Sequence, residues 1–144
     1  MKLFVDAAWD SLFHYGEELC GDKVEIVRGD RYFFCVLADG LGSGVKANIL
    51  STLTSKIIAT MMSEGALLEE AVETIASTLP VCSERGLAYS TFTIVKVSPA
   101  GEVYLAEFDN PLAVYFQDGV FTPIEREELL LDGKQVYISR FQAG

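Results

Sequence analysis

The sequence predicts an α+β domain whose sheet is largely antiparallel. Segments with strand periodicity come first, two consecutive segments with helix periodicity follow, and further strand-like segments complete the chain. Short turns join neighbouring strand segments, and no linker, repeat or low-complexity stretch divides the 144 residues. We therefore expect one domain over residues 1–144, and not an alternating, parallel α/β fold.

The first part of the chain predicts strands. Residues 3–15 are apolar and aromatic apart from two aspartates, and we expect a strand with an irregular middle there. Residues 23–28 alternate between apolar and charged side chains, and residues 31–38 have a nearly continuous apolar centre. The tight turn at Gly29-Asp30 joins these last two runs, which predicts a hairpin.

Two helices are expected next, after a glycine-rich loop. Apolar residues recur at intervals of three and four positions over residues 45–62, at Leu50, Leu53, Ile57 and Met61. The same spacing predicts a second helix over residues 67–79, and Pro80 ends it.

The remainder of the chain is rich in Thr, Phe, Ile and Val and predicts strands. Two further hairpins are expected, from residues 88–97 with 103–108 and from residues 112–116 with 120–124. A last strand covers residues 136–141. The acidic cluster around Arg126 is expected to be a solvated loop.

The composition excludes several classes of function. With a formal net charge of −10 the chain has nothing to neutralise a run of phosphates, so no nucleic-acid partner is expected. The single histidine, His14, excludes multi-histidine zinc sites, and Cys20, Cys35 and Cys82 lack CxxC spacing and are expected to be free thiols. No apolar run approaches the ~20 residues that cross a bilayer, and the amino terminus does not resemble a signal peptide. We therefore expect a cytoplasmic protein without a membrane partner.

The loop before the first helix carries the strongest chemical signal. Asp39 directly follows a buried strand, and glycines at positions 40, 42 and 44 let the backbone approach a ligand closely. A carboxylate beside a free backbone carbonyl suits Mg²⁺ or Mn²⁺, because these hard cations prefer oxygen ligands. Such a cation would also supply the positive charge that a strongly negative chain needs to bind an anionic substrate. A loop without any ligand is the alternative.

A dinucleotide site is the rival functional interpretation. Residues 42–47 fit the pattern GxGxx[GA] between a strand and a helix. Two features count against it. Asp39 would place a negative charge near the pyrophosphate, and the first helix is followed by a second helix instead of a parallel strand with its ribose-binding acid.

Two segments together carry a family resemblance. Residues 16–22 (GEELCGD) and 36–47 (VLADGLGSGVKA) resemble the metal-dependent PPM, or type 2C, protein phosphatases. Within these the chain looks most like the stage II sporulation protein E branch and its stress-response relatives, which residues 90–94 and 107–111 also match. The resemblance covers nearly the whole chain. It implies an α-β-β-α sandwich of largely antiparallel sheets, with a metal centre at one end of the sheets.

The resemblance also implies a function and a set of site residues. Members of the family remove phosphate from phosphoserine or phosphothreonine on a regulatory protein, such as an anti-sigma antagonist-type regulator, through a water activated by two Mn²⁺ or Mg²⁺ ions. Asp39 would be the catalytic aspartate that bridges the ions, and the Gly40 carbonyl would bind one of them. Asp22 would bind the second ion, directly or through water. A catalytically degenerate module that acts by binding a partner is the alternative.

One departure from the family concerns the end of the sequence. The family completes its metal site with an aspartate in a late Ser-Asp-Gly segment, and this sequence ends at Gly144 before such a segment. We therefore expect a fold that is incomplete at its C-terminus, either a truncated piece or a natural degenerate, with weakened metal binding and little turnover. We also expect an unpaired outer edge on the strand over residues 136–141, which would favour self-association.

Other polar residues have simpler expectations. Asp109 could be a further ligand, but a turn in which Asp109 and Asn110 bond their own backbone is the simpler interpretation. Arg28, Arg31 and Arg85 could meet a phosphate, and the sequence does not indicate which of them faces the site.

Overall fold

The chain folds in the predicted order of strands, two helices and strands. The computed structural model describes residues 4–10, 21–29, 32–40, 44–78, 90–131 and 133–143. The elements are β1 (Asp22–Arg28), β2 (Phe33–Asp39), α1 (Gly44–Ser63), α2 (Leu68–Thr78), β3 (Thr91–Val97), β4 (Glu102–Phe108), β5 (Tyr115–Gln117), β6 (Val120–Thr122), β7 (Glu127–Leu131) and β8 (Lys134–Gln142).

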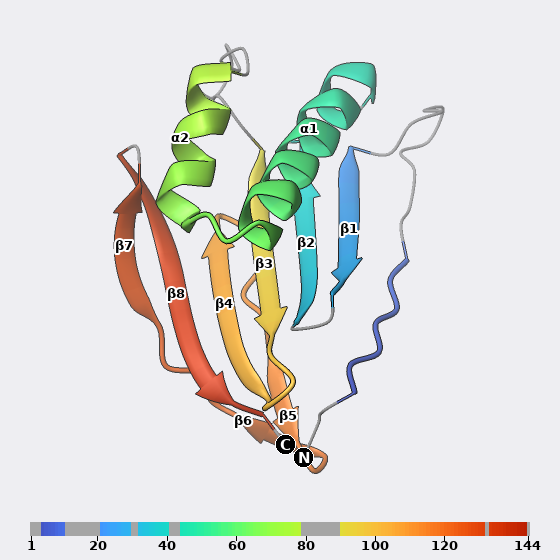
Figure 1. Cartoon of the computed structure of the whole chain (residues 1–144), viewed down its shortest axis with the longest axis vertical. Coiled ribbons are helices and arrows are strands. Elements are labelled where there is room, and N and C mark those ends of the chain that lie inside the picture. Colours follow the sequence, from blue (N-terminus) through green and yellow to red (C-terminus); the bar gives the residue numbers. More distant parts are fainter. Residues whose placement is uncertain are drawn as a thin grey trace.

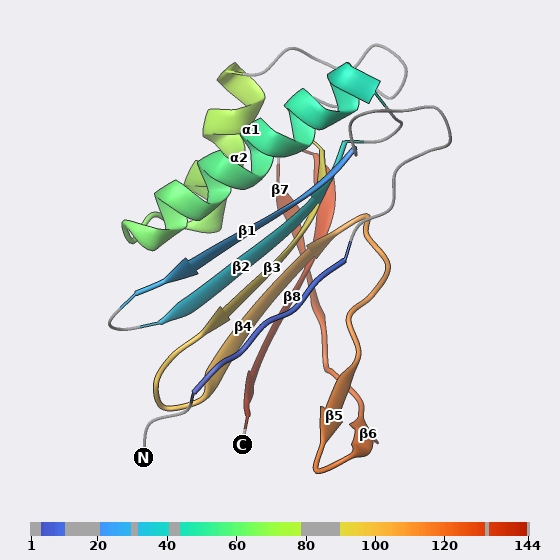
Figure 2. The same ribbon diagram turned by 90° about the vertical axis from the view of Figure 1, so that its right-hand side faces the viewer.

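Six of these strands form one antiparallel sheet in the order β1-β2-β3-β4-β8-β7. Both helices lie on the same face of this sheet (Figure 1). The hairpin of β5 and β6 lies on the other side, below the sheet in the view of Figure 2. The predicted antiparallel α+β class is confirmed, and the described residues supply the helix layer and one sheet of the expected sandwich.

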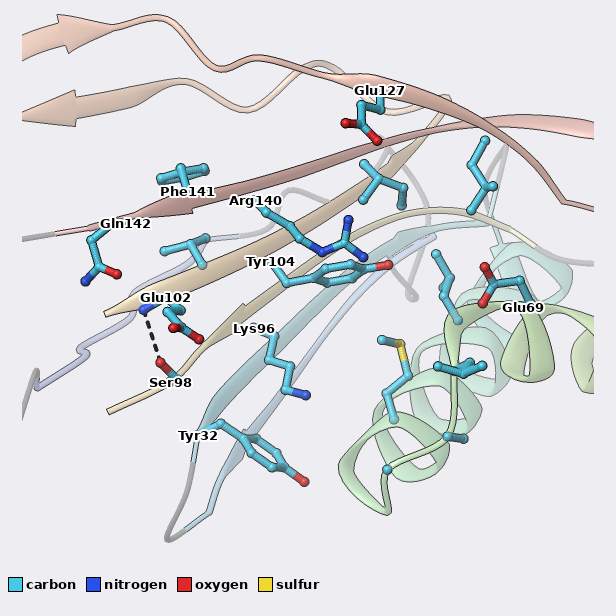
Figure 3. Close-up of a pocket in the computed structure, with 18 of the residues that line it drawn as sticks. Tyr32, Glu69, Lys96, Ser98, Glu102, Tyr104, Glu127, Arg140, Phe141 and Gln142 are labelled. Atoms are coloured by element: carbon cyan, nitrogen blue, oxygen red, sulfur yellow. Dashed lines mark hydrogen bonds between the residues drawn. The ribbon is translucent and has the colours of Figure 1, made fainter. Parts of the chain in front are cut away.

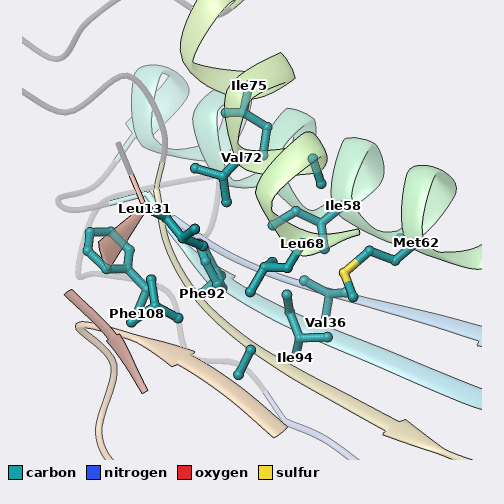
Figure 4. Packing of buried hydrophobic residues seen from close by; sticks show 14 of the residues in the cluster. Val36, Ile58, Met62, Leu68, Val72, Ile75, Phe92, Ile94, Phe108 and Leu131 are labelled. Atoms are coloured by element: carbon teal, nitrogen blue, oxygen red, sulfur yellow. The ribbon is translucent and has the colours of Figure 1, made fainter. Parts of the chain in front are cut away.

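Strand alternation sorts the apolar side chains onto the two faces of the sheet. Phe34 and Val36 of β2 join the main core under the helices, whereas Phe33 and Cys35 belong to a smaller cluster on the other face. Figure 4 shows the main core, in which strand residues meet Ile58, Met62, Leu68, Val72 and Ile75 of the two helices. The segment over residues 4–10 packs against the smaller cluster through Val5 and Ala7.

Helix α1 is confirmed, and Leu50, Ile57 and Met61 of the predicted apolar row pack against the main core, although they are only partly buried. Leu53 is 40% exposed, and Val45 and Ile49 are exposed as well. The fully buried positions of the helix include Ile58 and three small hydroxyl residues, Ser51, Thr54 and Ser55.

All three predicted hairpins form. β1 pairs with β2, β3 with β4 and β5 with β6, each in an antiparallel register. The third hairpin is shorter than predicted, with three residues in each strand. Its turn contains Asp118 and Gly119, with φ angles of 51° and 79°. Aspartate and glycine tolerate the left-handed region better than most residues, which is why this pair suits the turn.

Two predictions at the edge of the sheet are wrong. The acidic cluster was expected to be a loop, but Glu127–Leu131 form strand β7, which pairs with β8. Strand β8 therefore lies between β4 and β7 and is hydrogen-bonded on both edges. The register with β7 covers residues 134–138 of β8, so the prediction of an unpaired outer edge is wrong for residues 136–138. The self-association inferred from a bare edge over all of residues 136–141 loses much of its basis.

The beginning of the chain also differs from expectation. Residues 4–10 form no strand, and the rest of the predicted strand over residues 3–15 lies outside the described residues. His14, Cys20 and Cys82 lie outside them too. Cys35 is a half-buried free thiol, as predicted. Within the described ranges, neither helix combines the length and the apolar character that a membrane span requires.

Candidate metal centre

The two predicted carboxylate ligands lie opposite each other at one end of the sheet. Asp22 is the first residue of β1 and Asp39 the last of β2, and the antiparallel register pairs them directly. Opposed residues of an antiparallel pair put their side chains on the same face, with Cα atoms about 4.5–5.5 Å apart. By alternation along β2 this is the face away from the helices, because Phe33 and Cys35 point there. Asp39 is half-buried and Asp22 is exposed, so the pair is accessible from solvent.

Gly40 is held tightly between β1 and helix α1. Its N–H donates to the carbonyl of Gly21 at 2.8 Å, which extends the β1–β2 pairing by one residue. A Cβ on Gly40 would lie 2.0 Å from the carbonyl oxygen of Ala47, so only glycine fits at this position. Residues 41–43 lie outside the described residues, and the Gly40 carbonyl as a ligand stays a prediction.

The surroundings of this loop contradict a dinucleotide site. Strand β2 is flanked by β1 and β3, and both pairings are antiparallel. Helix α1 leads to α2 and not to a strand. A dinucleotide-binding unit needs a second parallel strand beside the first, so that alternative is wrong.

Asn110 bonds across the sheet instead of forming the expected local turn bonds. Its Oδ1 accepts from Oγ1 of Thr91 at 2.6 Å, and its Nδ2 donates to Oγ1 of Thr93 at 3.0 Å. A longer contact of 3.5 Å joins Nδ2 to the carbonyl of Leu37 in β2. Sequence reasoning missed Thr91 and the cross-strand role of Asn110, although both lie in the segments that carry the family resemblance.

The remaining candidates do not complete a site around the two aspartates. Asp109 is exposed with a φ of 52°, which fits the predicted turn. Arg28 lies at the opposite end of β1 from Asp22, whereas Arg31 and Arg85 fall outside the described residues. Over the part of the chain that the structure describes, no group of three or more His, Cys, Asp or Glu could hold a metal ion.

A buried ion pair anchors the segment beyond β4. Glu107 is 1% exposed, and Nε of Arg126 donates to its Oε1 at 2.7 Å. Its Oε2 accepts from the N–H of Ala113 at 2.7 Å, and Nη2 of Arg126 donates to the Ala113 carbonyl at 2.8 Å. Charges buried this deeply need such a full set of partners. The pair therefore fastens the segment that leads to the β5–β6 hairpin onto the sheet.

A hollow of about 960 Å³ lies on the helix-facing side of the sheet, toward its other end. Figure 3 shows Lys96, Tyr104 and Arg140 projecting into it from three neighbouring strands. Burial raises the pKa of the Tyr104 hydroxyl, while the charge of Arg140 opposes this rise and that of Glu69 adds to it. Neither aspartate of the candidate metal centre lines the hollow, so the two places are separate.

The fold matches several solved structures. RsbX in complex with magnesium is 22% identical, with a TM-score of 0.54 over 70% of this chain and 48% of that chain. The PP2C phosphatase domain with a fragment of the regulatory domain of SpoIIE from Bacillus subtilis is 19% identical, with a TM-score of 0.69 over 86% and 38%. The RsbU and RsbW domains of Rv1364c from Mycobacterium tuberculosis are 15% identical, with a TM-score of 0.70 over 91% and 38%. At these identities the likeness shows the fold, and this chain spans less than half the length of each.

The sequence also matches a family model. No curated protein sequence matches the chain. Residues 29–136, which are most of the chain, match the model described as stage II sporulation protein E (SpoIIE). This range contains Asp39, Gly40 and Asn110, and the match confirms the resemblance found in the sequence. The chain therefore belongs to the stage II sporulation protein E (SpoIIE) family, a branch of the PPM-type phosphatases.

Proposed function

We propose that this chain forms the metal-binding part of a phosphatase that acts on phosphoserine or phosphothreonine of a regulatory protein, with Mn²⁺ or Mg²⁺ as its cofactor. The observation that supports this most directly is the register that pairs Asp22 with Asp39 at the ends of β1 and β2. The family relationship supports phosphatase activity in general. The magnesium in the RsbX structure supports a divalent cation.

The donors at this end of the sheet fit a hard cation. Two carboxylates share one face, and the backbone of Gly40 follows directly, so the donors are oxygens only. On a chain with a net charge of −10, a divalent cation would supply the positive charge that a phosphate substrate requires. When bound, the ions would provide the Lewis acidity for phosphoryl hydrolysis. In the proposed site Asp39, Asp22 and the Gly40 carbonyl would hold the ions, with Asp39 as the ligand that they share.

A phosphatase-like module that works by binding is the second candidate. The observation that favours it is that only two carboxylates come together here, and no third one joins them among the described residues. Two hard cations held by fewer oxygens bind more weakly. In this case the chain would recognise a phosphoprotein without turning it over.

Thermal unfolding with and without metal tests the site. A ligand that binds only the folded state at a concentration of 100 Kd stabilises it by about 2.7 kcal/mol, roughly a 5–10 °C rise in Tm at this chain length. We expect Mn²⁺ to raise Tm, and Asp39→Asn or Asp22→Asn to remove most of the rise. Asp118→Asn is the matched control, because it makes the same change of charge on an exposed aspartate in the β5–β6 turn.

Two outcomes decide between the candidates. A Mn²⁺ shift that survives undiminished in Asp39→Asn would place the site elsewhere and contradict the proposal. If Asp39 is required for the shift, hydrolysis of a phosphoserine peptide is measured next. Metal-dependent release of phosphate supports the phosphatase, and metal binding without release supports the binding module.

A further inference from the structure

Thr91 connects Asn110 to Asp39. The register of β2 and β3 places Thr91 directly opposite Asp39, so Asp22, Asp39 and Thr91 form a row across three strands on one face. Thr91 is 1% exposed, and its Oγ1 lies 3.4 Å from the Asp39 carbonyl oxygen and 2.6 Å from Oδ1 of Asn110. Since a hydroxyl has one hydrogen to donate, the short contact with Asn110 takes it and fixes the rotamer of Thr91.

The Asn110 side chain is itself held in place. Its loop leaves β4 and is closed by the hydrogen bond of 2.7 Å from the Ala113 N–H to Oε2 of Glu107. Asp109, immediately before it, has a φ of 52°, which turns the chain back over β3. Arg126 bonds Glu107 as well, so the loop is anchored to the sheet from both sides. A side chain held in this way can orient its neighbours, because its own rotamer is locked.

We propose that Asn110 is a positioning residue for the candidate metal centre and acts on Asp39 through Thr91. The inference rests on the proposed function, because it takes Asp39 as a metal ligand. Thr91 stands on one side of Asp39 in the row and Asp22 on the other. Side chains directly opposite each other on neighbouring strands lie within reach of each other. A Thr91 side chain with a fixed rotamer therefore limits the rotamers open to the Asp39 side chain, and so the direction in which its carboxylate faces a cation shared with Asp22. Neither Asn110 nor Thr91 has to touch the ion.

Mn²⁺ affinity, measured by calorimetric titration of the full chain, tests this role. Thr91→Val removes the hydroxyl at nearly constant side-chain shape, and Asn110→Ala removes the amide. Loss of one such hydrogen bond corresponds to a factor of about three to ten in an equilibrium constant, so we expect each change to weaken Mn²⁺ binding by about that factor. Thr93→Val is the matched control. It makes the same substitution two positions further along β3, on the same face, and it also removes a hydrogen bond to Asn110. Thr91 keeps its hydroxyl and its place beside Asp39, so the Mn²⁺ affinity of Thr93→Val should stay closer to that of the native chain.

The double variant Asn110→Ala/Thr91→Val distinguishes positioning from general destabilisation. Both single changes break the same link, so the double variant should bind Mn²⁺ no more weakly than the weaker single variant. Equal affinities in Thr91→Val, Thr93→Val and the native chain would overturn the inference and leave Asn110 as an anchor of its loop. If Asn110→Ala does not fold, as judged by its Tm without metal, Thr91→Val decides the question alone.

Asp39→Asn separates this failure from failure of the proposed function. If Asp39→Asn abolishes Mn²⁺ binding while Thr91→Val leaves it unchanged, only the positioning role is refuted. If Asp39→Asn binds Mn²⁺ as tightly as the native chain, or the native chain binds none, both proposals are refuted together.

Discussion

Replacing Gly40 by alanine should destabilise the fold at the candidate metal centre. The added Cβ would lie 2.0 Å from the Ala47 carbonyl oxygen, 2.5 Å from its carbonyl carbon and 2.7 Å from its Cα. All three atoms belong to the backbone of helix α1, so no change of rotamer can relieve the clash. The helix or the end of β2 has to move.

The size of the effect follows from these contacts. Overpacking of a buried position costs about 1–3 kcal/mol, and a shifted Gly40 also loses its hydrogen bond to Gly21, worth about 1 kcal/mol. A total of about 2–4 kcal/mol corresponds to a fall in Tm of roughly 6–12 °C for a chain of this length. Mn²⁺ binding should weaken in parallel, because Gly40 follows Asp39 directly.

Gly29→Ala is the matched control for this experiment. A Cβ on Gly29 would meet only the Tyr32 carbonyl oxygen at 3.5 Å, which is an ordinary contact, so its Tm should stay near the native value. Thermal unfolding followed by circular dichroism compares the two variants. Equal Tm values for Gly40→Ala and Gly29→Ala would refute the claim that α1 approaches β2 this closely.

Two further predictions concern buried polar groups. Arg126→Met should lower the free energy of unfolding in urea by about 3–5 kcal/mol because it leaves the buried Glu107 carboxylate unpaired, whereas Lys56→Met, which breaks an exposed pair with Glu25, should cost no more than about 1 kcal/mol. Equal costs would show that Glu107 is solvated. Burial raises the pKa of the Cys35 thiol, so the unfolded chain releases this proton first as pH rises through the ordinary thiol range near ~8.5, and stability is lost there. Above that pH the urea midpoint of the native chain should therefore fall relative to that of Cys35→Ala. A difference between the two midpoints that stays constant with pH would contradict the raised pKa of Cys35.

Elements with a clear period were predictable from the sequence, and β7 was not. Its residues, Glu127–Leu131, combine two acids with three leucines and contain no β-branched side chain. The strand exists because β8 offers it a partner, and the turn at Gly133, with a φ of 72°, brings the two together. A pattern within five residues carries no information about such a partner. The same pairing covers residues 134–138 of β8, which is part of the edge that was predicted to be bare.

The candidate site, too, was predictable from the sequence only in part. The glycine-rich loop singled out Asp39 and Gly40, and the family resemblance added Asp22. The hairpin register then places the two carboxylates side by side. Asn110 looked like a turn residue because aspartate and asparagine before proline commonly bond their own backbone. Its actual partners are 17, 19 and 73 residues away, so only the tertiary fold reveals them. Short-range propensity therefore predicted the turn at Asn110 but not the cross-strand contacts of its side chain.

Helix α1 shows why periodicity can find an element and still miss part of its buried face. Large apolar residues such as Leu53 defined the predicted row, yet the fully buried positions include Ser51, Thr54 and Ser55. Hydroxyl groups can be buried on a helix when they bond nearby groups. The hydroxyls of Ser51 and Ser55 donate to backbone carbonyls three residues earlier, each at 3.1 Å. Thr54 accepts from the backbone N–H of Ser90 at 3.2 Å.

These small residues explain the close approach of α1 to the sheet. The distance between packed elements depends on the size of the side chains at their contact. The serine, threonine and alanine residues on this face, which also carries Ile58 and Met62, therefore let the helix lie nearer to β1 and β2 than a row of leucines would. The same closeness puts the Ala47 backbone against Gly40 and excludes a Cβ there. The spacing of apolar residues predicts that the large side chains of α1 face the sheet. The close packing next to the candidate metal centre depends instead on its small side chains.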